Sequence, residues 1–231
     1  DRIIAISGFI AEHIRTGYGV APERIRTVAR GIDFRRFNPD NVTAERMATL
    51  SHAWRLPDDR KVILCPGRLT RIKGHAILFE ALARLKRQDV ICVIAGSDQG
   101  RTDYTRELES LATRLGLEGV VKLVGDCTDI PTALMLADVV VAPSIVPEGF
   151  GRVPVEAQAM GRPVIASNLA GMKETVQPGQ TGWLVPAHDS NALAEALDQA
   201  LNLTPEQRVA LAATAINHAR AHYSVEHMCW Q

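Results

Sequence analysis

The chain has 231 residues, 46% of them hydrophobic and 23% charged, which is the composition of an ordinary globular protein with a sizeable core. Its 26 basic residues balance 26 acidic ones, so the charge gives no indication of a nucleic-acid partner. No apolar run approaches the roughly 18 residues that a membrane-spanning helix needs, and we expect no transmembrane segment.

The first sixty residues predict a strand, a helix and a second strand, followed by a linker. "RIIAIS" and "RIRTVARGID" are strand-like, and a helix is expected around "GFIAEHIRTGYG". The chain opens without an initiator methionine or a signal peptide, and three elements are too few for a domain. We therefore expect residues 1–33 to be the remnant of a preceding N-terminal domain. Residues 34–60 are polar and contain prolines, which predicts a linker with one short helix.

From Lys61 onward, short β-branched runs alternate with amphipathic helical stretches. The predicted strands are residues 61–65, 90–96, 120–125, 138–144, 162–167 and 181–186. Strands that are continuously apolar are buried on both faces, as in a parallel sheet covered by helices on each side. We therefore predict a doubly wound, Rossmann-like α/β domain over residues 61–203, with its ligands beyond the carboxyl ends of the strands.

Two helices are expected to close the chain. Asp189 or Ser190 is placed to cap the first of them, whose apolar stripe includes Leu193 and Leu197. "TPEQ" at 204–207 has the residues of a capping box, with proline at the first helical position. The sequence thus predicts a C-terminal helix over residues 204–231.

The four cysteines show no C-x-x-C spacing. Cys65 and Cys92 lie within predicted strands, so we expect buried free thiols, which are typical of a reducing, cytoplasmic compartment. His218 and His222 have an i, i+4 spacing that can hold zinc, but no third ligand is evident, and a solvated helix face is the favoured explanation of the pair. We predict no metal site.

A basic loop, "PGRLTRIKGH" (66–75), follows the first strand of the domain and carries Arg68, Arg71 and Lys73. It lacks the G-K-[ST] ending of a P-loop. Cations on a glycine-bounded loop before a helix can neutralise a diphosphate, although a solvated basic loop would have the same composition. A second stretch, "GDCTDIPTAL" (125–134), could offer backbone groups to a nucleobase, with Ile130 as our candidate.

An acidic block, "PEGFGRVPVEAQAMG", follows the strand at 138–144 and carries Glu148 and Glu156. Gly149 and Gly151 let the backbone approach a ligand, and the following helix directs its unpaired N–H groups at the same place. We expect Glu156 to lie two turns into that helix and to accept hydrogen bonds from both hydroxyls of a ribose, while Glu148 accepts from a sugar. Alternatively, both glutamates are ordinary surface residues.

The block "PSIVPEGFGRVPVEAQAMGRPVIASNLAGMKETVQPGQTGWLVP" resembles the donor-binding region of the family 4 retaining glycosyltransferases, which have the two-domain GT-B fold. Its E-x7-E hallmark is Glu148 to Glu156. "GRLTRIKG" is similar to the phosphate-binding loop of that family, and "ISGFIAEHIRTGYGVAPERIRTVARGID" to its crossing between domains. Departures are Arg30 before Gly31, where Asn is frequent, and Ala170 before Gly171, where the family has Gly-Gly ahead of the glutamate that is here Glu174.

The resemblance implies a C-terminal donor-binding domain that is inactive by itself and returns toward a missing acceptor domain through its last helix. It implies transfer of a sugar from a nucleotide-diphosphate sugar to a saccharide or lipid-linked acceptor, with retention and without metal or other cofactor. The implied catalytic residues are Arg68, Lys73 and Glu148. The implied donor-binding residues are Gly67, Ile130, Gly149, Phe150, Gly151 and Glu156.

Two alternatives stay open: a non-catalytic nucleotide-sugar-binding module, and a nucleotide-sugar epimerase of related fold. The sequence contains no Asp-x-Asp, the motif with which other glycosyltransferases hold a divalent metal on the diphosphate. The resemblance also suggests a role in cell-surface polysaccharide or lipopolysaccharide synthesis, with contact at the inner face of a membrane as an option. Self-association through uncovered apolar surface of the fragment is a further expectation.

Overall fold

Six parallel strands form the central sheet, in the spatial order β5-β4-β3-β6-β7-β8. The computed structural model describes residues 2–230 of the chain. The strands of this sheet are β3 (Lys61–Pro66), β4 (Val90–Ala95), β5 (Val121–Gly125), β6 (Val139–Ala142), β7 (Val164–Ser167) and β8 (Trp183–Val185). All six agree closely with the predicted strands.

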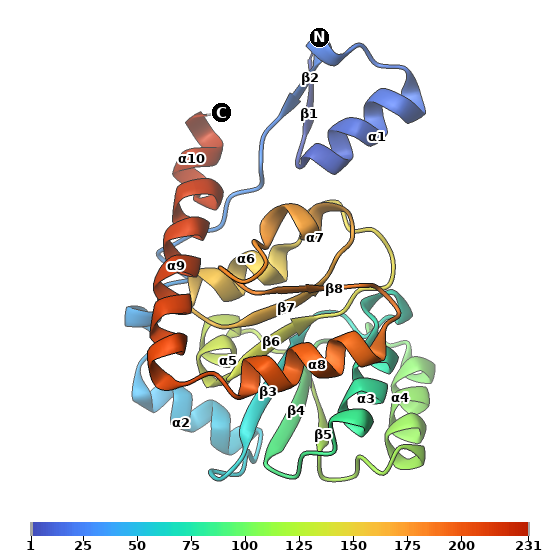
Figure 1. Ribbon diagram of the computed structural model, residues 1–231, viewed down its shortest axis with the longest axis vertical. Helices are drawn as coiled ribbons and strands as arrows, with labels where there is room; N and C mark the ends of the chain where they lie inside the picture. The colour runs from blue at the N-terminus through green and yellow to red at the C-terminus, as the bar shows by residue number, and fades with distance from the viewer. Residues whose placement is uncertain (1, 231) are drawn as a thin grey trace.

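Helices cover both faces of the sheet (Figure 1). They are α3 (His75–Leu85), α4 (Thr102–Arg114), α5 (Ile130–Leu136), α6 (Arg152–Ala159), α7 (Ala170–Thr175), α8 (Ser190–Leu201) and α9 (Pro205–Tyr223). Alternate residues of each strand enter two separate apolar layers. Ile63 and Cys65 pack with α3, α4 and α8, whereas Val62 and Leu64 pack on the side of α5, α6 and α9. The predicted doubly wound, Rossmann-like fold is confirmed.

The direction in which strands are added to the sheet reverses between β3 and β6. From β3 the chain adds β4 and β5 on one side, and from β6 it adds β7 and β8 on the other. The loops that follow β3 and β6 therefore leave in opposite directions and open a crevice at their carboxyl ends, where ligands of such sheets bind. The basic loop and the acidic block of the sequence are these two loops.

The predicted caps of the closing helices are present. The Asp189 carboxylate accepts hydrogen bonds from the N–H groups of Asn191 and Ala192, so Asp189 caps α8. Thr204 and Gln207 form the complete capping box of α9.

The predicted C-terminal helix is divided in two, because Ser224 adopts an extended conformation (φ −75°, ψ 153°) between α9 and α10 (Val225–Trp230). There the chain forms a parallel bridge with Ile32. Asp1 and Gln231, the outer bounds of the predicted terminal units, lie outside the described residues.

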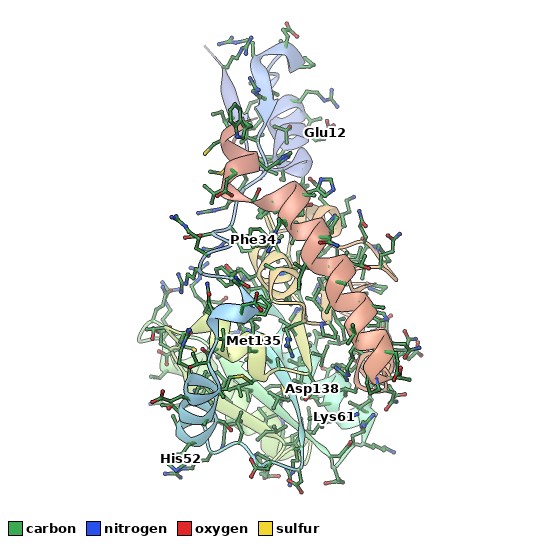
Figure 2. The ribbon with its side chains drawn as sticks, turned by 90° about the vertical axis from the view of Figure 1, so that its left-hand side faces the viewer. Glu12, Phe34, His52, Lys61, Met135 and Asp138 are labelled. Carbon is green, nitrogen blue, oxygen red and sulfur yellow. The ribbon has the colours of Figure 1, made fainter. Side chains whose placement is uncertain are left out.

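The N-terminal unit (residues 3–27) stands apart from the main sheet (Figure 1). It consists of β1 (Ile3–Ala5), α1 (Gly8–Tyr18) and β2 (Ile25–Thr27), and β1 pairs only with β2 in parallel register. These are the strand, helix and strand expected there. Ile4 is 66% exposed, so this small sheet leaves apolar surface uncovered. Figure 2 shows the last helices running from the level of Asp138 toward this unit, which carries Glu12.

The segment between the two parts contains the expected short helix, α2 (Ala44–Ala53). This helix lies on α5, to which Arg46 is joined by an ion pair of 2.7 Å with Asp129. Phe37 and Trp54 from the same segment are buried in the core of the sheet domain. Residues 34–60 are thus packed against the domain along their length.

Within residues 2–230, no helix combines the length and apolar character required to cross a membrane. Cys65 and Cys92 are buried free thiols, as predicted, and burial raises the pKa of Cys65 to about 12.

Candidate functional site

A cleft of about 470 Å³ lies at the carboxyl ends of β3 and β6. Its walls come from the loops after these two strands, the beginnings of α5 and α6, and two residues of the N-terminal part, Ile6 and Arg30. The sequence-predicted residues that line it are Gly67, Arg68, Lys73, Ile130, Glu148, Gly149, Phe150 and Glu156. The structure therefore brings together residues from three loops that are far apart in the chain.

The basic loop is held against the end of β6 by close backbone packing. Gly74 has a φ of +73°, and a Cβ at this position would lie 1.9 Å from the carbonyl oxygen of Pro143. Gly67 has a φ of +144°, a conformation that side chains disfavour. Glycine is required at position 74 for two reasons: the backbone has a positive φ there, and it lies in close contact with the loop after β6.

The three cations of this loop do not act together. Lys73 and Arg68 line the cleft. Arg71 instead forms an ion pair with Glu107 of α4, and its guanidinium lies 5.3 Å from the centre of the Tyr104 ring. Arg71 is therefore a surface residue of the α3–α4 side, and the cleft receives two cations from the loop.

Glu148 is held by two donors on the same carboxylate oxygen. Lys73 Nζ donates to Oε1 at 2.7 Å, and the Ser144 hydroxyl donates to Oε1 as well. The side chains of Lys73 and Glu148 are only 19% and 24% exposed, which strengthens their attraction relative to a surface pair. Because both donors use Oε1, the carboxylate is oriented and its Oε2 oxygen is left to a ligand.

Glu156 is buried, with 7% of its surface exposed, and Arg152 Nη2 donates to its Oε1 at 2.7 Å. Burial raises the pKa of Glu156, because the low-dielectric surroundings disfavour the carboxylate more than Arg152 favours it. The prediction that Glu156 lies two turns into its helix was wrong. Helix α6 begins at Arg152, so Glu156 lies one turn into it. Neither glutamate is the freely solvated surface residue of the alternative interpretation.

The two glycines around Phe150 differ in position. Gly149 lines the cleft, but Gly151 does not. A Cβ on Gly151 would lie 3.0 Å from Thr175 Oγ1 and 3.1 Å from Met172 Cα, so this glycine lets the loop pack on α7. Gly151 also precedes α6 without a side-chain cap, so the N–H groups of Arg152 and Val153 begin the helix uncapped, whereas Pro154 has no N–H.

Sequence reasoning missed Ser144, Arg152 and Ile6, and gave Arg30 no ligand role, although all four line the cleft. The spacing of Arg152 to Glu156, four residues within one helix, was a detectable signal for their ion pair. Ile6 carries no such local signal, because its cleft neighbour Gly149 comes from another element, and Ser144 meets Glu148 within a loop that has no helical spacing to predict the contact.

The histidines take no part in the cleft. His75 is the first residue of α3 and is fully buried beside the Tyr104 hydroxyl at 3.3 Å. Burial lowers the pKa of His75 to about 4. His218 contacts Gln158 through Nδ1 at 2.9 Å, and its ring lies 4.9 Å from that of His222. Over residues 2–230, no three or more histidine, cysteine, aspartate or glutamate side chains are grouped to hold a metal ion.

A parallel sheet with a polar cleft at its switch point defines a Rossmann-like, ligand-binding α/β domain. A solved glycosyltransferase from Rickettsia africae superimposes on 99% of this chain with a TM-score of 0.96 and 30% identity, over 60% of its own length. Anabaena Alr3699/HepE in complex with UDP superimposes on 100% of the chain with a TM-score of 0.91 and 29% identity, over 62% of its own length.

The chain belongs to the family Glycosyl transferases group 1, whose model matches residues 47–218. It is 34% identical over 229 residues to a D-inositol 3-phosphate glycosyltransferase of Saccharomonospora viridis, with 95% of this chain and 52% of that protein aligned. A D-inositol 3-phosphate glycosyltransferase of Catenulispora acidiphila is 36% identical over 228 residues, with 95% and 53% aligned. The chain thus spans about half the length of these curated relatives.

Proposed function

We propose that this chain is the donor-binding part of a retaining glycosyltransferase that uses a nucleotide-diphosphate sugar. The observation that carries the proposal is the meeting of Lys73, Glu148 and Glu156 around one cleft at the switch point of the sheet. Membership of the glycosyltransferase family supports transfer over the alternatives of a binding module or an epimerase. Structures of Anabaena Alr3699/HepE with UDP and with UDP-glucose support a donor of this type.

The diphosphate of the donor would lie between the basic loop and α6. Arg68 and Lys73 supply positive charge on one side, and the N–H groups of Arg152 and Val153 with the dipole of the α6 N-terminus supply it on the other. A cation and a phosphate about 4 Å apart attract by around 4 kcal/mol at an effective dielectric near 20. Two such cations can replace a divalent metal, and we therefore propose a metal-independent reaction.

The two glutamates would hold the two sugars of the donor. Glu148 Oε2 is available to hydroxyls of the transferred sugar, since its other oxygen is taken by Lys73 and Ser144. Glu156 would accept hydrogen bonds from the ribose hydroxyls. Its burial beside Arg152 orients the carboxylate before the donor arrives.

In the reaction, the bond between the anomeric carbon and the diphosphate oxygen breaks, and the diphosphate leaves with the electron pair. An acceptor hydroxyl forms the new glycosidic bond on the same face of the sugar and gives its proton to the departing diphosphate oxygen. Negative charge on the leaving oxygens grows in the transition state, which is where Arg68, Lys73 and the α6 N-terminus contribute most.

The acceptor, a saccharide or a lipid-linked sugar, would be held largely by polypeptide outside this chain. The N-terminal unit, with its uncovered apolar face at Ile4, is the part that would continue into such a domain. The chain alone should therefore bind nucleoside diphosphates without transferring sugar. A cytoplasmic enzyme of cell-surface polysaccharide or lipopolysaccharide synthesis, in peripheral contact with the membrane, is our proposal for its setting.

The proposal is tested first on donor binding. UDP, GDP and ADP, and then their sugars, are titrated into the chain by calorimetry with a chelator present, and we expect one base to bind and to raise the melting temperature. Full-length protein is then incubated with the radiolabelled sugar of that nucleotide and with saccharide and lipid acceptors. Labelled acceptor with the anomeric configuration of the donor supports the proposal. An isomerised donor supports the epimerase, and binding without either reaction supports the module.

A further inference from the structure

A carboxylate on α7 holds the beginning of α1, although the two lie 166 residues apart in the chain. Glu174 Oε2 accepts a hydrogen bond from the Gly8 N–H at 2.8 Å, and Oε1 accepts one from the Phe9 N–H at 2.7 Å. The Ser7 hydroxyl accepts from the Ile10 N–H at 3.1 Å. The first turn of α1 contains no acidic residue of its own, so Glu174 supplies the negative charge that a helix N-terminus favours.

The other end of α7 rests on the loop that carries Glu148. The Gly171 N–H donates to the backbone carbonyl of Glu148 at 3.0 Å. A Cβ on Gly171 would lie 2.7 Å from both the Gly149 carbonyl oxygen and Phe150 Cα. Helix α7 therefore cannot shift along this loop without moving the backbone of the donor site.

Tyr223, at the end of α9, ties a third segment to the same helix. Its hydroxyl donates to the Glu174 carbonyl oxygen at 2.9 Å, and its ring packs edge-on to Phe150 at 5.6 Å. The Tyr223 carbonyl in turn accepts from the Ile32 N–H at 2.8 Å. The crossing segment at Ile32 and the end of α9 are thus joined beside α7.

The beginning of α1 also reaches the cleft directly. A Cβ on Gly149 would lie 3.2 Å from Ile10 Cδ1 and 3.6 Å from Ile6 Cδ1. Ile6 lines the cleft. The segment that Glu174 holds is therefore one wall of the donor site and, at the same time, part of the N-terminal unit.

We propose that Glu174 is a positioning residue for sugar transfer, which holds the N-terminal unit in fixed register with the Glu148–Phe150 loop. The inference rests on the proposed function, since it assigns the N-terminal unit to the acceptor side of the reaction. Glu174 lies outside the cleft lining and acts through α1, so its loss should disturb the alignment of acceptor and donor while leaving the phosphate and ribose contacts in place.

The experiment compares Glu174→Gln, Glu174→Asp and the control Lys173→Ala, whose side chain is exposed on the same helix. Glutamine offers one acceptor oxygen in place of two and places an N–H₂ group against a backbone donor. Aspartate retains the charge and both oxygens. Amide hydrogen exchange and binding of UDP, GDP and ADP are measured on this chain, and kcat is measured on the full-length protein.

We expect Glu174→Gln to speed amide exchange at Gly8 and Phe9 by about two- to fivefold. This is the change in the local opening equilibrium expected when a helix N-terminus loses one favourable charge interaction. In the full-length protein kcat should fall by about tenfold or more, since displacing reacting groups by about 1 Å can cost on the order of 10²-fold. Nucleotide affinity should stay within about twofold, because the groups that hold the donor are unchanged. Glu174→Asp should recover part of the loss, and Lys173→Ala should match the wild type.

Unchanged exchange at Gly8 and Phe9, or an unchanged kcat, would overturn the inference. So would an equal fall of kcat and nucleotide affinity, because Glu174 would then support only the donor loop. If wild-type protein transfers no sugar at all, the proposed function fails, and the exchange measurement alone decides whether Glu174 holds α1.

Discussion

Replacing Lys73 with alanine removes a cation of the cleft that is held in place by a partly buried carboxylate, Glu148. In the structure Lys73 Nζ is 2.7 Å from Glu148 Oε1, and a bound diphosphate would have to share it. A free cation about 4 Å from a phosphate is worth around 4 kcal/mol at an effective dielectric near 20. Sharing with Glu148 reduces the ground-state part to about half, or about 2 kcal/mol, which corresponds to a Kd raised about 30-fold.

The effect on turnover should be larger than the effect on binding. Charge on the leaving diphosphate grows in the transition state, and loss of a single oriented charge partner there costs on the order of 10²-fold or more in kcat. In addition, Lys73→Ala leaves the Glu148 carboxylate facing the phosphates without its cation. Calorimetric titration of the nucleoside diphosphate into this chain and turnover by the full-length protein measure the two effects separately.

Arg71→Ala is the matched control, since it removes a cation from the same turn. Arg71 is paired with Glu107 and stacked on Tyr104 away from the cleft, and its side chain is 65% exposed. Its replacement should leave the Kd within about twofold, as for other exposed ion pairs. Equal losses from the two replacements, or a Lys73→Ala protein with near-normal turnover, would refute the assignment of the diphosphate to this loop.

Three further outcomes are expected from single substitutions. Burial raises the pKa of Glu156, so the fold favours the protonated side chain. Its contribution to stability is present below the pKa of the unfolded chain and is lost as the pH rises through the pKa of the folded chain. In calorimetry, Glu156→Gln, which does not ionise, should therefore melt above wild type by a margin that widens from pH 4 to pH 7. Burial lowers the pKa of His75 to about 4, so the free energy of unfolding should fall as the pH drops from 6.5 to 4. Urea unfolding at the two pH values should show a fall that is smaller by about 3 kcal/mol in His75→Leu than in wild type. Gly74→Ala, whose Cβ would lie 1.9 Å from the Pro143 oxygen, should cost about 3 kcal/mol or more of unfolding free energy, whereas Gly119→Ala, also at positive φ but with no atom within 4 Å, should cost about 1 kcal/mol; equal costs would show that backbone conformation alone sets the requirement for glycine.

The sequence alone determined the strands and helices of the sheet domain and the loops that carry its chemistry. Runs such as "VILC" (62–65) are apolar at every position, as expected of a strand buried on both faces, and the capping box at Thr204 is a purely local pattern. The meeting of Lys73 and Glu148 at one edge of the sheet could also be predicted, because each residue follows a predicted parallel strand. Carboxyl ends of parallel strands meet at one edge of a sheet, whatever their distance in the chain.

Only the tertiary structure decided which residue of a loop enters the cleft and which leaves it. Arg71 and Lys73 are two positions apart on the same turn, yet one meets Glu107 and the other Glu148, because α4 lies on one side of the turn and β6 on the other. The burial of Glu156 and the contact of Glu174 with α1 likewise depend on how distant segments pack. Glu174 and its partner Gly8, for example, are 166 residues apart in the chain. Hydrogen bonds and burial between distant segments depend on how the elements pack, and a local pattern of residue types does not contain that information.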